Sequence, residues 1–241
     1  MTRKLPSPRR GLARLFSAVA VAAAMCAAPA QAGVLDFETP VDAPFVFAGD
    51  VLTFGKYYVE GAGTAGFVGS VSTSDSCDAA QLCPVNNTST YYTAYDDGYM
   101  FFGMADGSAF TLKSLDASFI GAGAASYPNV AALLYIRAFD ANGMVAEAYY
   151  DLAGPSGGSF NFATYDLSDF GDGALFTDVL VASFACTAGS TTCDRTTNQA
   201  NFAIDNIVTV DAVSDVPEPG SFALLGLGLL GLRAARRRRA A

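Results

Sequence analysis

Residues 91–99 combine aromatic rings with neighbouring carboxylates, a mixture that suits the binding of a sugar. Aromatic faces stack on sugar rings, while carboxylates accept hydrogen bonds from sugar hydroxyls. The ligand-binding residues predicted here are Tyr91, Tyr92, Tyr95, Asp96, Asp97 and Tyr99. Tyrosines at this density are also common in the strands of β-sandwiches, where their rings pack against neighbours. Both interpretations are open at this point.

The chain contains no histidine and no tryptophan. This composition excludes Ser-His-Asp triads, Cys-His dyads and histidine-ligated zinc within one subunit. A pair of carboxylates is sufficient for glycoside hydrolysis, and the glutamates available for it between residues 33 and 216 are Glu38, Glu60 and Glu147. No motif selects such a pair, so we predict no catalytic residues and a non-enzymatic protein.

Charge is distributed unevenly along the chain. Residues 33–216 hold 4 Lys and Arg against 22 Asp and Glu, a net charge of -18, whereas five cations precede residue 15 and five follow residue 232. An acidic domain of this kind repels polyphosphates, so a nucleic-acid partner is not expected.

Both ends of the chain have the pattern of targeting segments. Residues 1–32 contain a basic start, an apolar stretch and the small-residue sequence Ala30-Gln31-Ala32, which predicts a signal peptide cut by signal peptidase after Ala32. A permanent membrane helix is a poorer interpretation, because the apolar stretch is shorter than the roughly 20 residues of a span.

Residues 217–241 place a Pro-Glu-Pro motif, an apolar stretch of thirteen residues and an arginine cluster in that order. The motif is Pro217, Glu218 and Pro219, and the cluster is Arg233, Arg236, Arg237, Arg238 and Arg239. Because arginines stay on the cytoplasmic side, the apolar segment would form a short helix held transiently in the inner membrane, with the motif at its outer face.

This order resembles the PEP-CTERM sorting signal. The resemblance implies processing by an exosortase membrane peptidase in bacteria that make exopolysaccharide and grow in biofilms. It also implies export across the inner membrane, followed by location at the cell surface or outside the cell. An uncut tail anchor is the alternative. Residues 211–216 are predicted to be a linker before the signal.

The segment between the targeting signals, residues 33–210, alternates β-branched or aromatic residues with polar ones and lacks a long amphipathic helix. It is predicted to be one all-β sandwich. The expected strands are 33–38, 51–59, 67–72, 99–104, 110–120, 131–139, 144–151, 158–165, 176–184 and 202–210. The clearest hairpin joins two of these through residues 140–143, where Asn142 and Gly143 tolerate positive φ.

The opening residues 34–38 and closing residues 202–208 resemble the first and last strands of bacterial jelly-roll domains, which include many carbohydrate-binding modules. The resemblance implies a jelly-roll-like β-sandwich. It also implies a structural calcium ion that links the first strand to the last through Asp36, Glu38 and Asp205. The alternative is that Asp205 only accepts hydrogen bonds from a turn.

Four cysteines in the exported part form two local pairs, Cys77 with Cys83 and Cys186 with Cys193. Export to an oxidising compartment favours two disulfides over a zinc site, because the spacings are wider than those of zinc knuckles. Crossed pairing is also compatible with the sequence. Together these features predict an exported, non-enzymatic protein that associates with exopolysaccharide, with a carboxylate-based, polysaccharide-active enzyme as the alternative.

Overall fold

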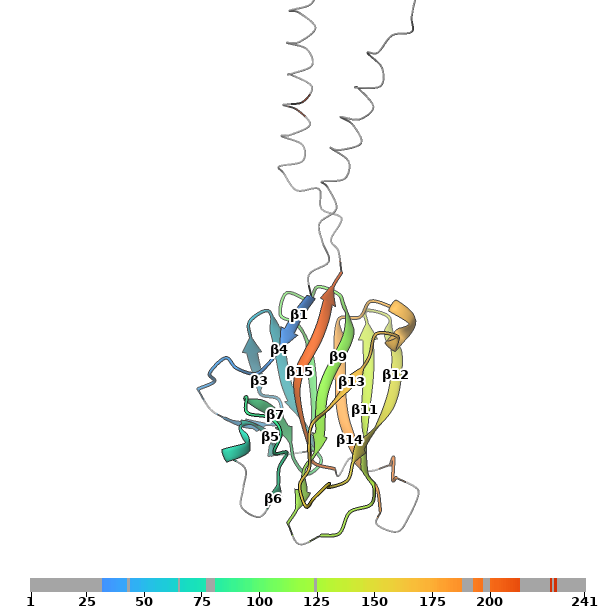
Figure 1. Cartoon of the computed structure of the whole chain (residues 1–241). Helices are drawn as coiled ribbons and strands as arrows, with labels where there is room; N and C mark the ends of the chain where they lie inside the picture. The colour runs from blue at the N-terminus through green and yellow to red at the C-terminus, as the bar shows by residue number, and fades with distance from the viewer. Residues whose placement is uncertain are drawn as a thin grey trace, which may run out of the picture. The chain divides into compact units, whose positions relative to one another are not determined.

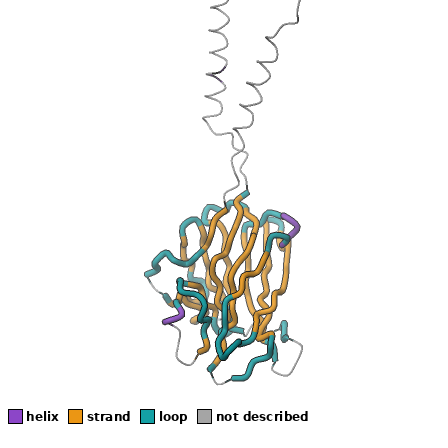
Figure 2. Tube along the Cα trace, viewed as in Figure 1, coloured by secondary structure: helices purple, strands orange, loops and turns teal. Residues whose placement is uncertain are grey.

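The computed structural model describes residues 32–212, except 43, 65, 77–80, 124, 188–192 and 197–199, together with two helical residues, Gly226 and Gly228. All the described strands lie within one compact unit, Gln31–Ala212. All but two of them form two antiparallel sheets that pack face to face (Figure 1, Figure 2). The predicted all-β, jelly-roll-like sandwich is therefore confirmed.

One sheet has seven strands and the other has six. The seven-stranded sheet runs in the order β13 (Ala163–Asp166), β9 (Phe110–Phe119), β15 (Phe202–Asp211), β7 (Tyr91–Ala94), β5 (Phe67–Ser72) and β2 (Phe45–Phe47), with β1 (Ala32–Leu35) also paired to β15. The six-stranded sheet runs in the order β12 (Gly143–Ala153), β11 (Val130–Asp140), β14 (Asp178–Ala185), β8 (Tyr99–Met104), β4 (Tyr57–Ala62) and β3 (Val51–Phe54).

Smaller elements lie outside the two sheets. A two-stranded ribbon pairs β6 (Gln81–Leu82) with β10 (Gly121–Ala122). Two 3-10 helices, η1 (Ser74–Ser76) and η2 (Phe170–Gly173), complete the described secondary structure. Within the described residues, no helix is long and apolar enough to span a membrane. The predicted signal peptide before Ala32 and the sorting helix, apart from Gly226 and Gly228, lie outside the described residues.

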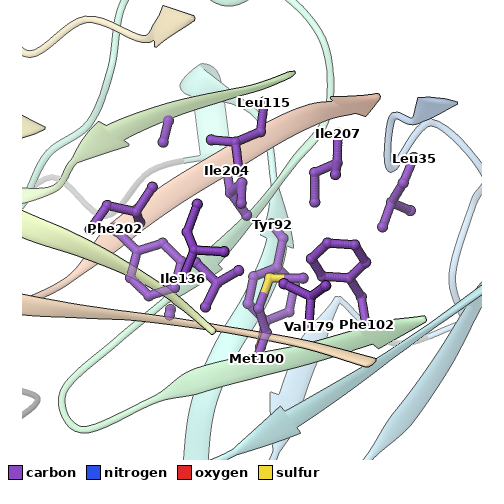
Figure 3. Close-up of a cluster of buried hydrophobic side chains, with 14 of the residues drawn as sticks. Leu35, Tyr92, Met100, Phe102, Leu115, Ile136, Val179, Phe202, Ile204 and Ile207 are labelled. Carbon is purple, nitrogen blue, oxygen red and sulfur yellow. The ribbon is translucent and has the colours of Figure 1, made fainter. Parts of the chain in front are cut away.

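The core fills the space between the sheets, and strand alternation decides which side chains enter it. Ile136 of β11 is fully buried and faces Phe202 and Ile204 of β15 across the sandwich (Figure 3), and Leu134 of the same strand is also fully buried. Successive residues of a strand point to opposite faces, so Tyr135 and Arg137 are on the outer face of the six-stranded sheet.

The expected β11–β12 hairpin is confirmed, and its turn shows one difference from the sequence expectation. Gly143 has φ 126°, but Asn142 does not have positive φ. Instead the Asn142 N–H donates a 2.7 Å hydrogen bond to the Asp140 side chain, which closes the turn locally.

The segment expected as one strand over residues 51–59 is a hairpin of β3 and β4. Gly55 has φ 58° at the first central position of its two-residue turn, a position that favours glycine. The segment 91–94, predicted as part of a ligand site, is the strand β7 between β15 and β5.

Candidate functional site

Among the side chains on the outer face of the six-stranded sheet are six aromatic rings from β8, β11, β12 and β14. Their neighbours along the strands, such as Ile136, Val181 and Phe102, fill the core, so alternation directs these six outward. We call this surface the aromatic face. Its rings are those of Tyr99, Phe101, Tyr135, Phe139, Tyr149 and Phe184.

Three of these rings pack together at one end of the aromatic face. Tyr135 and Tyr149 are directly opposite each other on β11 and β12, and their rings stack with centroids 4.7 Å apart. Phe184 lies 5.7 Å from Tyr135 and 6.3 Å from Tyr149. Tyr135 is covered by its neighbours, whereas Tyr149 is 37% exposed, so part of the Tyr149 ring reaches solvent.

Charged groups lie beside these rings. The Tyr135 hydroxyl donates a 2.7 Å hydrogen bond to Glu147 Oε2, and the Arg137 guanidinium makes a 3.0 Å ion pair with the same oxygen. These two partners, the Tyr135 hydroxyl first, lower the pKa of Glu147. Burial and the Glu147 carboxylate raise the pKa of Tyr135 to about 12. At neutral pH the face therefore offers an ionised carboxylate and a guanidinium at fixed positions.

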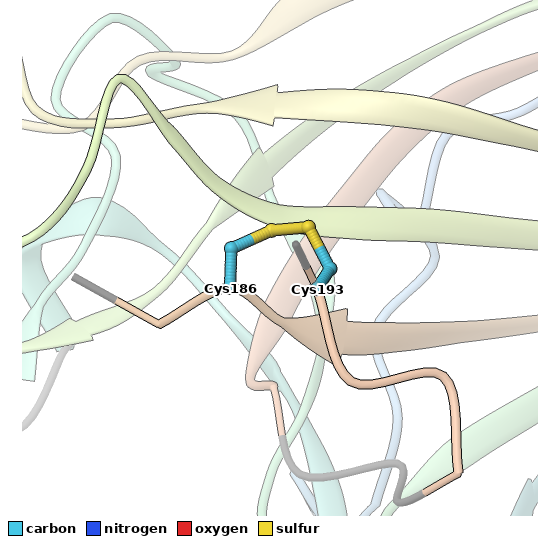
Figure 4. Close-up of a disulfide and its surroundings, with 2 residues drawn as sticks. All are labelled: Cys186 and Cys193. Carbon is cyan, nitrogen blue, oxygen red and sulfur yellow. A yellow bond between two sulfur atoms is a disulfide. The ribbon is translucent and has the colours of Figure 1, made fainter. Parts of the chain in front are cut away.

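Arg195, two residues after the disulfide-bonded Cys193, supplies a second guanidinium. Arg195 lies over the Tyr149 ring, 4.2 Å from its centroid, in a cation–π contact. The preceding loop is closed by the Cys186–Cys193 disulfide (Figure 4), which confirms this predicted pair. The Cys186 N–H also donates to Ala131 O at 2.9 Å, which fastens the loop to the start of β11.

The second predicted disulfide is described in part. Cys83 is disulfide-bonded. Its predicted partner, Cys77, lies outside the described residues. The pairing of Cys77 with Cys83 therefore stays a prediction.

The other end of the aromatic face continues across β8. The Tyr99 and Phe101 rings are 5.8 Å apart, and Phe101 is 6.5 Å from Phe139. Nearby, the Tyr58 hydroxyl donates a hydrogen bond to the Asp178 carboxylate. Burial and this carboxylate raise the pKa of Tyr58, so its hydroxyl stays protonated at neutral pH. Half-buried rings alternate here with hydrogen-bonding groups, an arrangement that suits stacking and hydroxyl recognition.

The ligand segment predicted at residues 91–99 does not form one surface. Tyr91 and Tyr92 are 0% exposed, so the prediction that their rings contact a ligand is wrong for this structure. Tyr92 faces the main core from β7, whereas Tyr91 packs with Ile120 and Ala203 beneath loops on the other side of the sheet. Tyr99 alone belongs to the aromatic face.

The remaining predicted residues, Tyr95, Asp96 and Asp97, lie in the turn after β7. The Tyr95 ring stacks on Phe67 at 5.5 Å. The Asp96 N–H donates to Asn201 at 2.8 Å, and Asp97 accepts a 2.9 Å hydrogen bond from the Thr64 N–H. These contacts place the turn beside the edge of the seven-stranded sheet, away from the aromatic face.

The three predicted calcium ligands have separate hydrogen-bond partners. Asp205 is 0% exposed, and its Oδ2 accepts hydrogen bonds from Asn87 at 2.8 Å and Ser89 at 2.9 Å. Glu38 accepts a 2.7 Å bond from the Thr90 N–H, and Asp36 Oδ1 accepts a 3.3 Å bond from the Glu38 N–H.

The segment 87–90 therefore lies where the resemblance implied a calcium ion, since it contacts both Glu38 and Asp205. In the described part of the chain, no three His, Cys, Asp or Glu side chains gather closely enough to hold a metal ion. Calcium binding by Asp36, Glu38 and Asp205 therefore stays a prediction. Burial raises the pKa of Asp205, although its hydrogen bonds oppose that shift.

Sequence patterns alone do not single out the aromatic face. Tyr135 and Tyr149 are 14 positions apart, and Phe184 and Arg195 follow much later, so only strand pairing brings them together. One signal was present: the predicted hairpin makes β11 and β12 neighbours. A register shift between Ala138 and Phe139, which was not predicted, places Tyr135 opposite Tyr149 and Arg137 opposite Glu147 on one face.

Comparisons with known proteins add one assignment outside the sandwich. Residues 215–239 match the model of the PEP-CTERM protein-sorting motif. The chain therefore carries a PEP-CTERM signal. Proteins with this motif are exported across the inner membrane and sorted to the cell surface or beyond, which confirms the predicted localisation. A comparison with curated proteins finds no match.

The PEP-CTERM chain is also distantly similar to solved structures. It is 14% identical to a family 11 carbohydrate-binding module from Clostridium thermocellum, covering 72% of this chain and 99% of that one at a TM-score of 0.31. A family 22 module of Xyn10B from the same organism is 13% identical, with coverages of 76% and 94% and a TM-score of 0.29.

An enzymatically active domain of a bacteriophage CBA120 tailspike is 15% identical over 66% of the PEP-CTERM chain, with a TM-score of 0.31. The chain spans 20% of that tailspike domain. At these scores the similarities do not distinguish a binding module from an enzyme.

Proposed function

We propose that the exported domain binds exopolysaccharide of the extracellular matrix through the aromatic face and does not cleave it. The observation that carries the proposal is the group of Tyr135, Tyr149 and Phe184 rings with Arg195 and Glu147 beside them. Export through a PEP-CTERM signal supports the proposal, because it delivers the domain to the compartment in which such polymers accumulate.

The geometry supports binding because it supplies both parts of sugar recognition. The exposed part of the Tyr149 ring offers apolar surface to a sugar, beside the Arg195 guanidinium that lies over the ring. Arg137 and Glu147 are paired two residues further along the same two strands, so they provide a donor and an acceptor for hydroxyl groups near that ring. The β-sheet beneath holds these groups in place before a ligand arrives, which lowers the entropic cost of binding.

The test is retention of the exported protein on immobilised exopolysaccharide from the bacterium that makes it. Tyr149→Ala and Arg195→Ala should each weaken retention about fivefold or more, since a stacking contact contributes ~1 kcal/mol. Val34→Ala is the control, because Val34 is exposed on β1 of the other sheet. Unchanged retention by folded Tyr149→Ala and Arg195→Ala proteins would contradict the proposal.

The second candidate function, a carboxylate-based glycosidase, has a direct assay. Prolonged incubation with the same polysaccharide should release no new reducing ends if the domain only binds. Release of reducing ends that disappears on replacing one glutamate would establish an enzyme instead.

A further inference from the structure

A second aromatic surface lies at the opposite sheet, where strand β2 forms an edge. Val46 of β2 is fully buried in the core, so its neighbours Phe45 and Phe47 point outward. Phe45 is 60% exposed, Phe47 is 51% exposed and Phe67 on the adjoining β5 is 37% exposed. With the half-buried Tyr95 they form what we call the edge patch.

The rings of the edge patch are contiguous around Phe67. The Phe67 centroid lies 5.9 Å from Phe45, 6.2 Å from Phe47 and 5.5 Å from Tyr95, onto which it stacks. Exposed large aromatics usually occur singly, so a contiguous group marks a binding surface. Tyr95 is one of the residues predicted from the sequence to bind a ligand.

Polar groups lie beside these rings. Asp97, two residues after Tyr95, accepts hydrogen bonds from the Thr64 backbone N–H and hydroxyl. These bonds lower the pKa of Asp97, so the carboxylate is ionised at neutral pH. The patch thus has an apolar centre and an acceptor group at its margin, as a sugar-binding surface needs.

The size and charge of the edge patch indicate what it binds. An aromatic side chain has an area of ~200 Å², so the three exposed fractions correspond to ~300 Å² of phenylalanine surface. A stable dimer needs about 800 Å² from each partner. The net charge of -18 over residues 33–216 also repels a second copy and anionic lipid. A neutral ligand with a small footprint, such as one or two sugar rings, fits both limits.

We infer that the edge patch is a second contact for a neutral polysaccharide, so that one domain binds two separate polymer segments and crosslinks them. The crosslinking part rests on the proposed function of the aromatic face. The two surfaces are on the outer faces of opposite sheets, with the core between them. One short oligosaccharide therefore does not contact both surfaces, whereas two polymer segments do. Once the first segment is bound, the second surface is held near the polymer, and this raised effective concentration strengthens overall binding.

The experiment compares four exported proteins: wild type, the double variant Phe45→Ser/Phe47→Ser, Tyr149→Ala, and the control Leu175→Ser. Leu175 is exposed, but it belongs to neither aromatic surface. The probe is the neutral fraction of the producing bacterium's exopolysaccharide. Retention on the immobilised polymer reports binding, and light scattering during titration of the soluble polymer reports crosslinking. Melting temperatures and size-exclusion profiles are measured for all four.

For wild type and Leu175→Ser, light scattering should pass through a maximum as the ratio of protein to polymer rises. It should decline at excess protein, because each polymer site is then occupied by a separate domain and crosslinks are lost. Both the edge-patch double variant and Tyr149→Ala should remain partly retained on the immobilised polymer. Their light scattering should be at least tenfold weaker than that of wild type. Scattering by the folded double variant equal to that of wild type overturns the inference. Retention of wild type without any scattering overturns it as well.

The failures of the two proposals are distinguishable. If Tyr149→Ala is retained like wild type while the edge-patch variant is not, the aromatic-face proposal fails and the edge patch is the glycan contact. If wild type is dimeric and the edge-patch variant is monomeric, the patch binds a second copy instead. Binding of wild type, but not of the variant, to phosphatidylcholine vesicles would assign the patch to a membrane surface. If wild type is not retained at all, both proposals are wrong.

Discussion

Replacing Asp205 by asparagine tests whether this buried carboxylate belongs to a hydrogen-bond network or to a calcium site. Its Oδ2 accepts from Asn87 and Ser89, while its Oδ1 accepts a 2.8 Å bond from the Asn206 N–H. Asparagine has one acceptor oxygen, so either orientation of its amide points an NH₂ group at another donor. At least one buried donor then loses its partner, which costs about 1–3 kcal/mol.

The pH dependence distinguishes the two roles by its sign. Burial raises the pKa of Asp205 above its ordinary value of 3.8 in the folded protein. The folded state therefore binds the proton more tightly than the unfolded state. The contribution of Asp205 to stability is largest below the unfolded pKa and falls as pH rises through the folded pKa. Asparagine does not titrate, so the stability curves of wild type and Asp205→Asn should converge as pH rises above 3.8.

The assay is urea unfolding of the exported protein between acidic and neutral pH, in EDTA and then in calcium or magnesium at matched ionic strength. In EDTA the variant should be about 1–3 kcal/mol less stable at neutral pH, or 2–4 °C lower in Tm for each kcal/mol. Calcium and magnesium should stabilise both proteins alike, by screening the negative charge.

A divergence of the two curves with rising pH would refute this reasoning, because it would mean that folding lowers the Asp205 pKa, as a bound cation does. A calcium-specific rise in the Tm of wild type that Asp205→Asn abolishes would refute it in the same way. The calcium-specific result would support the calcium site implied by the jelly-roll resemblance, whereas divergence in EDTA would mean that the hydrogen bonds of Asp205 outweigh its burial.

Two further predictions concern the aromatic face and the sorting signal. The Tyr135 and Arg137 partners lower the pKa of Glu147, so their stabilising contribution should be complete above about pH 4.5, the ordinary value, and lost as pH falls through the lower folded value. Urea unfolding should show a weaker acid dependence for Glu147→Gln than for wild type, and parallel curves would exclude this coupling. Replacing residues 236–239 with alanine should leave a longer, unprocessed form in the membrane fraction on immunoblots, because the positive charges that position the motif are gone. Unchanged processing would show that the arginines are dispensable.

The class of fold and the export of the protein could be predicted from the amino-acid sequence. Period-two alternation identified β5 and β8 at their observed ends and β11 within one residue at each end, because burial of one sheet face imposes that pattern locally. The sorting motif could also be identified from the sequence, because a peptidase recognises it as a linear segment. The Cys186–Cys193 pair followed from short spacing in an exported chain.

The sequence does not show which tyrosines are available to a ligand, because their exposure depends on tertiary packing. Tyr92 and Tyr149 both occur in alternating, tyrosine-rich strands, so the local pattern does not separate them. Tyr92 is in a central strand and faces the core, whereas Tyr149 is in the edge strand β12 and points outward. Burial depends on which sheet and which neighbours a strand acquires, and that is a property of long-range pairing.

The same physical reason explains the calcium prediction. The sequence placed Asp205 in the last strand, and the structure pairs that strand with β1. The hydrogen-bond partners of Asp205, however, come from Asn87 and Ser89, more than 100 positions earlier in the chain. A carboxylate accepts hydrogen bonds from whichever donors the fold brings to it, so its role was determined by packing rather than by its own strand.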